Sequence, residues 1–299
     1  MSRLENQVTK RDLKEIRRFF LDQFLQLYPK QPEEIVLDID GWDALTYGHQ
    51  QLSLFHGYYG HSIYFPVLIN EASSGYPLVL QLRRGNSHPG KGVAAILRWL
   101  FWRLKKAMPG VRIILRGDAG FSLPEILNVC ERSEVKYAFG FSSNAVLKRK
   151  INYRLDQARL QYFHTGEKAR LFDDVYYAAG SWDEPRRVIM KAEWLEKGAN
   201  PRFVVTNLET EAQELYDDFY VQRGASSEHL MLGIRQAAQG TRLAKAQVSR
   251  LRETIIKTTA KVTVSVRRVL VESSVHCPFA HEINLMAQRL YRGCQLIFS

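Results

Sequence analysis

The feature that most constrains the fold is the alternation of strand-like and helix-like hydrophobic patterns between residues 35 and 141. Three strand patterns are followed by helix, strand, helix and strand patterns, at residues 35–40, 63–69, 78–82, 91–107, 111–118, 124–133 and 135–141. Because the first three follow one another at short spacing, they predict an antiparallel meander. The whole order predicts a mixed α/β sheet flanked by helices.

This order of elements is that of the ribonuclease-H-like fold, which is the predicted fold class. Before it, apolar residues three and four positions apart predict an amphipathic helix over 9–27. After it, short strand-like pieces alternate with polar turns and predict a β-rich insertion. The expected organisation is a helical segment, a core in two pieces, the insertion and a basic C-terminal segment, at residues 1–33, 34–147 with 209–240, 148–208 and 241–299.

The charge of the chain is basic and unevenly distributed. Lys and Arg outnumber Asp and Glu by 42 to 31, which gives a formal net charge of +11. Most of that excess lies between Arg235 and the C-terminus. An excess of this size predicts a polyanionic partner, although charge alone does not separate DNA, RNA and an acidic membrane.

Cysteine usage and hydropathy exclude several other classes of protein. The three cysteines form no C-x-x-C pair, which excludes a disulfide scaffold and a cysteine-based zinc site as organising principles. The sequence has no run of about 18 apolar residues, and its first twenty residues are too charged for a signal peptide. We therefore expect a soluble intracellular protein.

Acidic residues stand at the ends of two predicted strands. Asp38 and Asp40 are two residues apart, so their side chains share one face of a strand, and Asp118 follows another apolar strand. An unpaired buried carboxylate is costly, whereas Mg²⁺ or Mn²⁺ bound between two strand ends would satisfy both. Two such ions about 4 Å apart stabilise both oxygens of an in-line phosphoryl displacement. The alternative is that these residues cap loops or helices.

A third metal ligand would have to come from the helical region after the insertion. Glu228 lies there, with Arg235 seven residues further on. On a helix the two side chains would lie two turns apart on one side, so one could bind metal while the other contacts phosphate. The alternative for Glu228 is a solvated acidic residue near a helix N-terminus.

These motifs together resemble the DDE transposases of bacterial insertion sequences, in the group with an Asp-led strand, an RGD-like second motif and an inserted β domain. The stretches that carry the resemblance are IVLDIDGWDALTYGHQQLSLFHGYYG at 35–60, PGVRIILRGDAGF at 109–121, NPRFVVTNL at 200–208 and GTRLAKAQVSRLRETIIK at 240–257. They occur in this order over nearly the whole chain.

The resemblance implies a ribonuclease-H-like catalytic domain with two Mg²⁺ or Mn²⁺ ions. It implies cleavage and transfer of DNA strands at the ends of the element. Carried over residue by residue, the catalytic and metal-binding carboxylates fall on Asp40, Asp118 and Glu228. The implied partners are double-stranded DNA, at element ends and target, and a second copy in a synaptic complex. No membrane partner is implied, and the expected location is the bacterial cytoplasm, at the nucleoid.

Basic residues provide the expected DNA contacts. The resemblance implies that Arg223 and Arg235 contact phosphate near the scissile bond. Flanking DNA is expected to contact basic residues of the C-terminal segment, among them Arg242, Lys245, Arg250 and Arg252. Neutralising phosphates would make binding strongly salt-dependent. The alternative for this basic run is a solvated helix.

The sequence departs from the family pattern at several points. Trp42 stands where a small hydroxyl residue is usual. The family's third signature has Tyr, Arg and Glu at fixed spacing, and in the series Tyr220, Arg223, Glu228 the Glu is displaced by one position. We expect an internal deletion after residue 228 and a truncated N-terminus. Two alternatives therefore stay open: a catalytically inert DNA-binding remnant, and a nuclease that cuts without preferring element ends.

Overall fold

The computed structural model describes most of the chain up to residue 223 and short pieces beyond it. The described residues are 10–26, 28, 30–46, 53–57, 60–223, 238–243, 260–264, 269–273, 279, 281–283, 285–286 and 296–298. The chain divides into two compact units. One contains Met1–Gln23 with Ala225–Ser299, and the other contains Phe24–Gly224.

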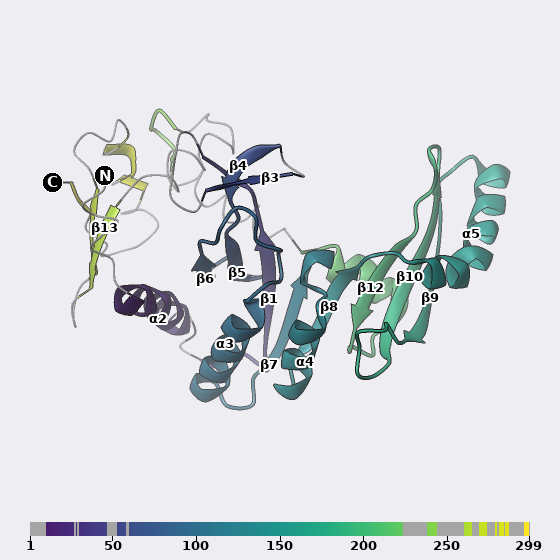
Figure 1. Ribbon diagram of the computed structural model, residues 1–299, viewed down its shortest axis with the longest axis horizontal. Coiled ribbons are helices and arrows are strands. Elements are labelled where there is room, and N and C mark those ends of the chain that lie inside the picture. Colours follow the sequence, from purple (N-terminus) through teal and green to yellow (C-terminus); the bar gives the residue numbers. More distant parts are fainter. Residues whose placement is uncertain are drawn as a thin grey trace. The chain divides into compact units, whose positions relative to one another are not determined.

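The larger unit is built on one mixed sheet (Figure 1). Its central strands lie in the order β6-β5-β1-β7-β8 and comprise β1 (Glu34–Gly41), β5 (Val67–Glu71), β6 (Pro77–Gln81), β7 (Arg112–Gly117) and β8 (Lys136–Phe141). Strand β5 runs antiparallel to β1 and β6, whereas β1, β7 and β8 are parallel to one another. The predicted mixed sheet flanked by helices, including the antiparallel meander, is confirmed.

Helices cover the sheet where the hydrophobic patterns predicted them. Helix α3 (Val93–Ala107) connects β6 to β7, and α4 (Pro124–Arg132) connects β7 to β8. The two helices pack against each other, and α4 also packs on β8. Every third or fourth residue of α3 is buried, namely Val93, Ile96, Leu97, Leu100, Phe101 and Leu104. The apolar spacing in the sequence thus directed this helix into the core.

The strand expected over 63–69 is wrong in its extent. Residues His61–Tyr64 form β4 and residues Val67–Glu71 form β5, with Pro66 in the break between them. Proline has no N–H to donate to a strand ladder, which gives a physical reason for the break. Strand β4 instead belongs to a small separate sheet of order β2-β4-β3, with β2 (Ala44–Leu45) and β3 (Leu54–His56).

The segment predicted as a β-rich insertion extends the same sheet. It contains β9 (Ala169–Tyr177), β10 (Arg186–Leu195), β11 (Gly198–Ala199) and β12 (Arg202–Thr206). Strand β12 pairs antiparallel with β8, so the order continues as β8-β12-β10-β11, and β9 pairs with β10. The hydrogen-bonded ladder therefore runs from the core into the insertion without interruption.

A long helix, α5 (Ala145–Thr165), precedes these strands and was not foreseen. The Asn144 side chain caps it by accepting hydrogen bonds from the Val146 and Leu147 amides, and Gly166 ends it in the left-handed region at φ 72°. Only three of its residues, Leu147, Ile151 and Ala158, are buried. So sparse an apolar stripe gives a weak helical period in the sequence.

After β12 the chain returns to the core through α6 (Ala212–Glu214) and the π-helical turn η2 (Leu215–Tyr220). The Val221 amide donates to the Tyr216 carbonyl, five residues back, at 2.9 Å. Buried residues of this segment form one hydrophobic cluster with residues of β8, β10 and β12, namely Ala138, Ile189, Val204, Ala212, Leu215, Tyr216 and Tyr220. The turn η2 therefore packs on one face of the sheet.

The smaller unit contains most of α2 (Lys10–Gln26), which agrees with the predicted helix over 9–27. It also contains a three-stranded sheet of β13 (Ala260–Val264), β14 (Val269–Ser273) and β15 (Leu296–Phe298). Within the described ranges, no helix has the length and apolar composition needed to cross a membrane.

Candidate functional site

Asp40 lies near the end of β1, and Asp118 directly follows the neighbouring parallel strand β7. The register of β1 and β7 pairs each residue with the one 78 positions later, as in Asp38 with Arg116 and Ile39 with Gly117. That is the last pair of the ladder, and Asp40 and Asp118 are the residues that follow it on the two segments. Since adjacent strands lie about 4.8 Å apart, we expect these two residues to lie close together at the same end of the sheet.

Asp38 forms a buried ion pair with Arg116. Its carboxylate accepts two hydrogen bonds from the Arg116 guanidinium, at 2.7 Å from Nε and 2.9 Å from Nη2. Both residues are only 5% exposed, whereas Asp40 is exposed. Because side chains two apart on a strand share a face, Asp40 and Asp118 lie on the same face as this pair. Asp38 thus holds the two strands together, and Asp40 lies exposed near the end of β1.

Arg116 also connects the sheet to η2. Its Nη1 donates to the Phe219 carbonyl at 2.6 Å, and its guanidinium carbon lies 4.8 Å from the centre of the Phe219 ring. One guanidinium thus joins β1, β7 and η2. Sequence reasoning missed this role. The available signal was the repeat of spacing, since Arg116 precedes Asp118 by two residues just as Asp38 precedes Asp40.

Asp118 is oriented by the turn that follows it. It precedes the 3₁₀ turn η1 (Ala119–Phe121), and its Oδ1 accepts a hydrogen bond from the Gly120 amide at 2.8 Å. Its Oδ2 makes no hydrogen bond with the described part of the chain. A Cβ at Gly120 would lie 2.8 Å from Pro89 Cβ and 3.1 Å from Asp118 Oδ1. Glycine therefore allows this tight turn.

Tyr220 packs beside the same turn. A Cβ placed on Gly140 would lie 2.6 Å from the Tyr220 hydroxyl and 2.9 Å from the Ala119 amide nitrogen. Tyr220 is 6% exposed, and burial raises its pKa to about 12. Arg223 acts in the opposite direction, while the charge of Asp118 adds to the rise. The Tyr220 hydroxyl therefore stays protonated at neutral pH, and it lies beside the turn that carries Asp118.

The predicted DNA-contacting arginines that the structure describes are engaged within the chain. The guanidinium carbon of Arg223 lies 4.0 Å from the centre of the Tyr220 ring, a cation–π contact. In the smaller unit, Arg242 pairs with Glu282, and this hydrogen bond lowers the pKa of the Glu282 carboxyl. The remaining predicted site residues lie outside the described residues, namely Glu228, Arg235, Lys245, Arg250 and Arg252.

The carboxylate pair suits a hard divalent cation. Asp40 and Asp118 supply oxygen donors from rigid strand ends, the ligand type that Mg²⁺ and Mn²⁺ prefer. Within the described ranges, no three His, Cys, Asp or Glu side chains gather into a metal-binding cluster. The third predicted ligand, Glu228, falls outside those ranges. Trp42, two residues after Asp40, is half-buried.

Comparison with known proteins gives one sequence-level match. A family model described as "Transposase DDE domain group 1" matches residues 1–230. A search of curated proteins finds no match.

Two solved structures that resemble this chain do so at low sequence identity. The synaptic complex of piggyBac transposase with hairpin DNA matches 74% of this chain at 15% identity and a TM-score of 0.42. This chain spans 45% of that transposase chain. Endonuclease V of Ciona intestinalis, in complex with inosine-containing DNA, matches 75% of this chain and 100% of its own, at 11% identity and a TM-score of 0.29.

Proposed function

The chain belongs to the transposase DDE domain group 1 family, and from that membership we propose that it cleaves and transfers DNA strands at the ends of an insertion sequence in a metal-dependent reaction. The observation that carries the proposal is the register of β1 and β7, because its last pair, Ile39 with Gly117, comes immediately before Asp40 and Asp118. The partners are element ends and target DNA, bound by a homodimer in a synaptic complex.

Asp40 and Asp118 would hold the metal, with Glu228 as the third ligand. Two divalent ions, when bound, supply Lewis-acid stabilisation of the attacking and leaving oxygens of a phosphoryl displacement. The chain itself keeps the ligands in place. The Gly120 amide orients one oxygen of Asp118, and the buried pair of Asp38 and Arg116 fixes the two strands from which both ligands project.

Basic residues would bind the DNA backbone. Arg223 and Arg235 are proposed to contact phosphate near the scissile bond, and basic residues of the C-terminal segment to hold flanking DNA. A guanidinium retains its charge while stacked on an aromatic ring, so the packing of Arg223 on Tyr220 is compatible with a phosphate contact. Phosphate contacts position DNA without reading its sequence.

Removing either aspartate tests the catalytic assignment. Asp40→Asn and Asp118→Asn should each lose Mn²⁺ binding in calorimetry and lose cleavage of a plasmid carrying the DNA that flanks the gene, yet still bind that DNA. Asp156→Asn, an exposed carboxylate on α5, is the matched control and should keep both properties. Cleavage that persists in Asp118→Asn would show that the site is wrongly assigned.

The displaced Glu228 favours a second candidate, a catalytically inert DNA-binding remnant. The spacing from Tyr220 to Glu228 is one residue longer than in the family signature. Under this alternative, Glu228→Gln would bind Mn²⁺ as weakly as the parent protein, and neither would cut DNA. A parent protein that binds Mn²⁺ and cuts DNA, with both properties lost in Glu228→Gln, would exclude the remnant.

A further inference from the structure

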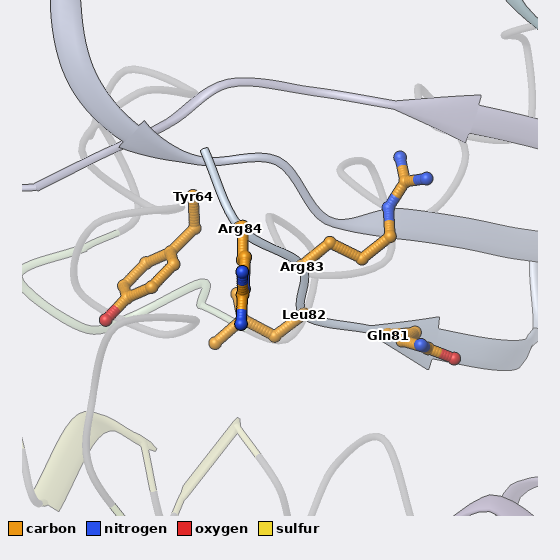
Figure 2. A pocket seen from close by; sticks show the side chains of 5 residues that line it. All are labelled: Tyr64, Gln81, Leu82, Arg83 and Arg84. Carbon is orange, nitrogen blue, oxygen red and sulfur yellow. The ribbon is translucent and has the colours of Figure 1, made fainter. Parts of the chain in front are cut away.

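A pocket lies at the end of β6, beside the small sheet. It is lined by Tyr64, Gln81, Leu82, Arg83 and Arg84 (Figure 2). Figure 2 shows the side chains of Tyr64, Leu82 and Arg84 extending toward the same side, while Arg83 extends away from them. Tyr64 and Arg84 are also backbone partners in an isolated antiparallel bridge.

The two neighbouring arginines of this pocket have different roles. Arg83 is bound to the protein, since its Nε donates to the Phe65 carbonyl at 3.1 Å and its Nη1 to the Pro89 carbonyl at 2.7 Å. Arg84 is exposed, and within the described part of the chain it makes no ion pair. Arg83 therefore holds the segment in place, and Arg84 presents an exposed guanidinium.

Exposed side chains continue from Arg84 toward the catalytic edge. Leu82 is 62% exposed and Leu80 is 48% exposed, an unusual pair of solvent-facing leucines at alternate positions. The strand register places Leu80 opposite Leu68, and Leu68 opposite Asp40. Residues opposite one another in a sheet share a face, so the leucines and Asp40 lie on the same face.

The dimensions of this surface suit a short stretch of one DNA strand. Leu80 is two strands away from Asp40, or about 10 Å, and the four residues from Leu80 to Arg84 span at most about 14 Å. Arg84 thus lies at most about 24 Å from Asp40, or about seven nucleotides at 3.4 Å each. The surface is also held in place, since a Cβ at Gly85 would lie 2.0 Å from the Ile63 carbonyl oxygen.

We propose that Tyr64, Leu80, Leu82 and Arg84, here called the β6 track, bind an unpaired DNA segment that adjoins the scissile phosphate. The proposal rests on the proposed function for the position of that phosphate at Asp40 and Asp118. Arg84 contacts a phosphate, and the Tyr64 ring and the leucines contact bases or sugars. Apolar and aromatic contacts to base faces require unpaired bases, whereas a guanidinium beside them matches the charge of the backbone.

The test compares two labelled DNA probes on the full chain by fluorescence anisotropy over a range of salt concentrations. One probe is a 20-base-pair duplex with a ten-nucleotide unpaired 3′ tail, and the other is a fully paired duplex of 30 base pairs. Arg84→Ala should lower the salt slope for the tailed probe by about 0.7, the value for one single-strand phosphate, and leave the paired probe unchanged. Tyr64→Ala should weaken tailed-probe binding about fivefold or more.

Two further arginine variants serve as controls. Arg98→Ala removes an exposed arginine from α3 and should change neither probe, and Arg84→Lys should restore the salt slope. Equal losses on both probes, or no loss with Arg84→Ala, would overturn the β6 track.

Cleavage of the flanking-DNA plasmid is measured in parallel. A loss confined to the tailed probe, without any cleavage by the parent protein, would support the β6 track and refute the proposed function. Cleavage by the parent protein, without a loss confined to the tailed probe, would support the proposed function and refute the β6 track.

Discussion

Asp38 and Arg116 form a buried, two-bond ion pair across neighbouring parallel strands, two residues before Asp40 and Asp118 on those strands. A bidentate pair restricts both the spacing and the register of the strands that carry it. Since Arg116 also donates to the Phe219 carbonyl, the same contact holds η2 against that face. The geometry of the candidate metal site therefore depends on an ion pair that is buried two residues before it.

Breaking this ion pair should be costly. Arg116→Met leaves the Asp38 carboxylate buried without its partner, and we expect a loss of about 3–5 kcal/mol in the free energy of unfolding. Replacing both residues, as in Asp38→Leu with Arg116→Met, should cost less than the single change because no unpaired charge remains. Urea denaturation measures both. Lys105→Ala, which removes an exposed ion pair with Glu134, should change stability by less than about 1 kcal/mol.

Gly140→Ala should disturb the turn beside Asp118. The added methyl would lie 2.6 Å from the Tyr220 hydroxyl and 2.9 Å from the Ala119 nitrogen, so we expect about 1–3 kcal/mol of destabilisation from overpacking. The displacement should also weaken Mn²⁺ binding in calorimetry. Gly180→Ala is the control, because nothing lies within 4 Å of its added methyl. Equal stability of the two variants would contradict the close contact.

The raised pKa of Tyr220 predicts a loss of stability at alkaline pH. The folded state keeps its proton up to about pH 12, whereas the unfolded chain loses it near pH 10. Stability is therefore complete below pH 10 and falls as the pH rises toward 12, by roughly 2–3 kcal/mol from this residue. Chemical denaturation from pH 9 to 11.5 should show a shallower fall for Tyr220→Phe than for the parent protein. Parallel curves would contradict the burial of this hydroxyl.

A second ion pair joins the insertion to α4. Arg186 on β10 donates to both Glu131 oxygens at 2.7 Å and to Asn128 at 2.6 Å. Burial opposes ionisation of Glu131, but hydrogen bonds from Arg186 and Tyr137 outweigh it and lower its pKa. A lowered carboxyl pKa contributes stability above the unfolded value of about 4.5 that is lost as the pH falls.

Glu131→Gln should remove this acid-sensitive contribution. The variant should be less stable than the parent at pH 7 and should differ less from it at pH 3, as measured by urea denaturation at the two values. Glu134→Gln is the matched control, because its carboxylate is exposed and forms a surface ion pair with Lys105 at 3.1 Å. A difference between Glu131→Gln and the parent that does not change with pH would refute the linkage.

Local sequence patterns were enough to predict the order of strands and helices in the core and the two aspartates at strand ends. Local periodicity carries that information: apolar runs produced β1, β7 and β8, and the spacing in α3 determined its buried face. Predictions from local patterns were less accurate where contacts between distant parts of the chain determine the structure. Helix α5 buries few apolar residues, and the strand predicted over 63–69 divides at Pro66 between two sheets.

Tertiary contacts distinguish the two aspartates of β1 and hold the candidate site in place. Asp38 and Asp40 are equivalent by strand period, and what distinguishes Asp38 is its buried pair with Arg116, 78 residues away. No local pattern encodes a contact at that separation. The same holds for the pairing of β12 with β8 and for the line of exposed residues from Arg84 toward Asp40, since both depend on which strands become neighbours. Chain neighbours determine secondary structure, whereas the site arises from the register between strands.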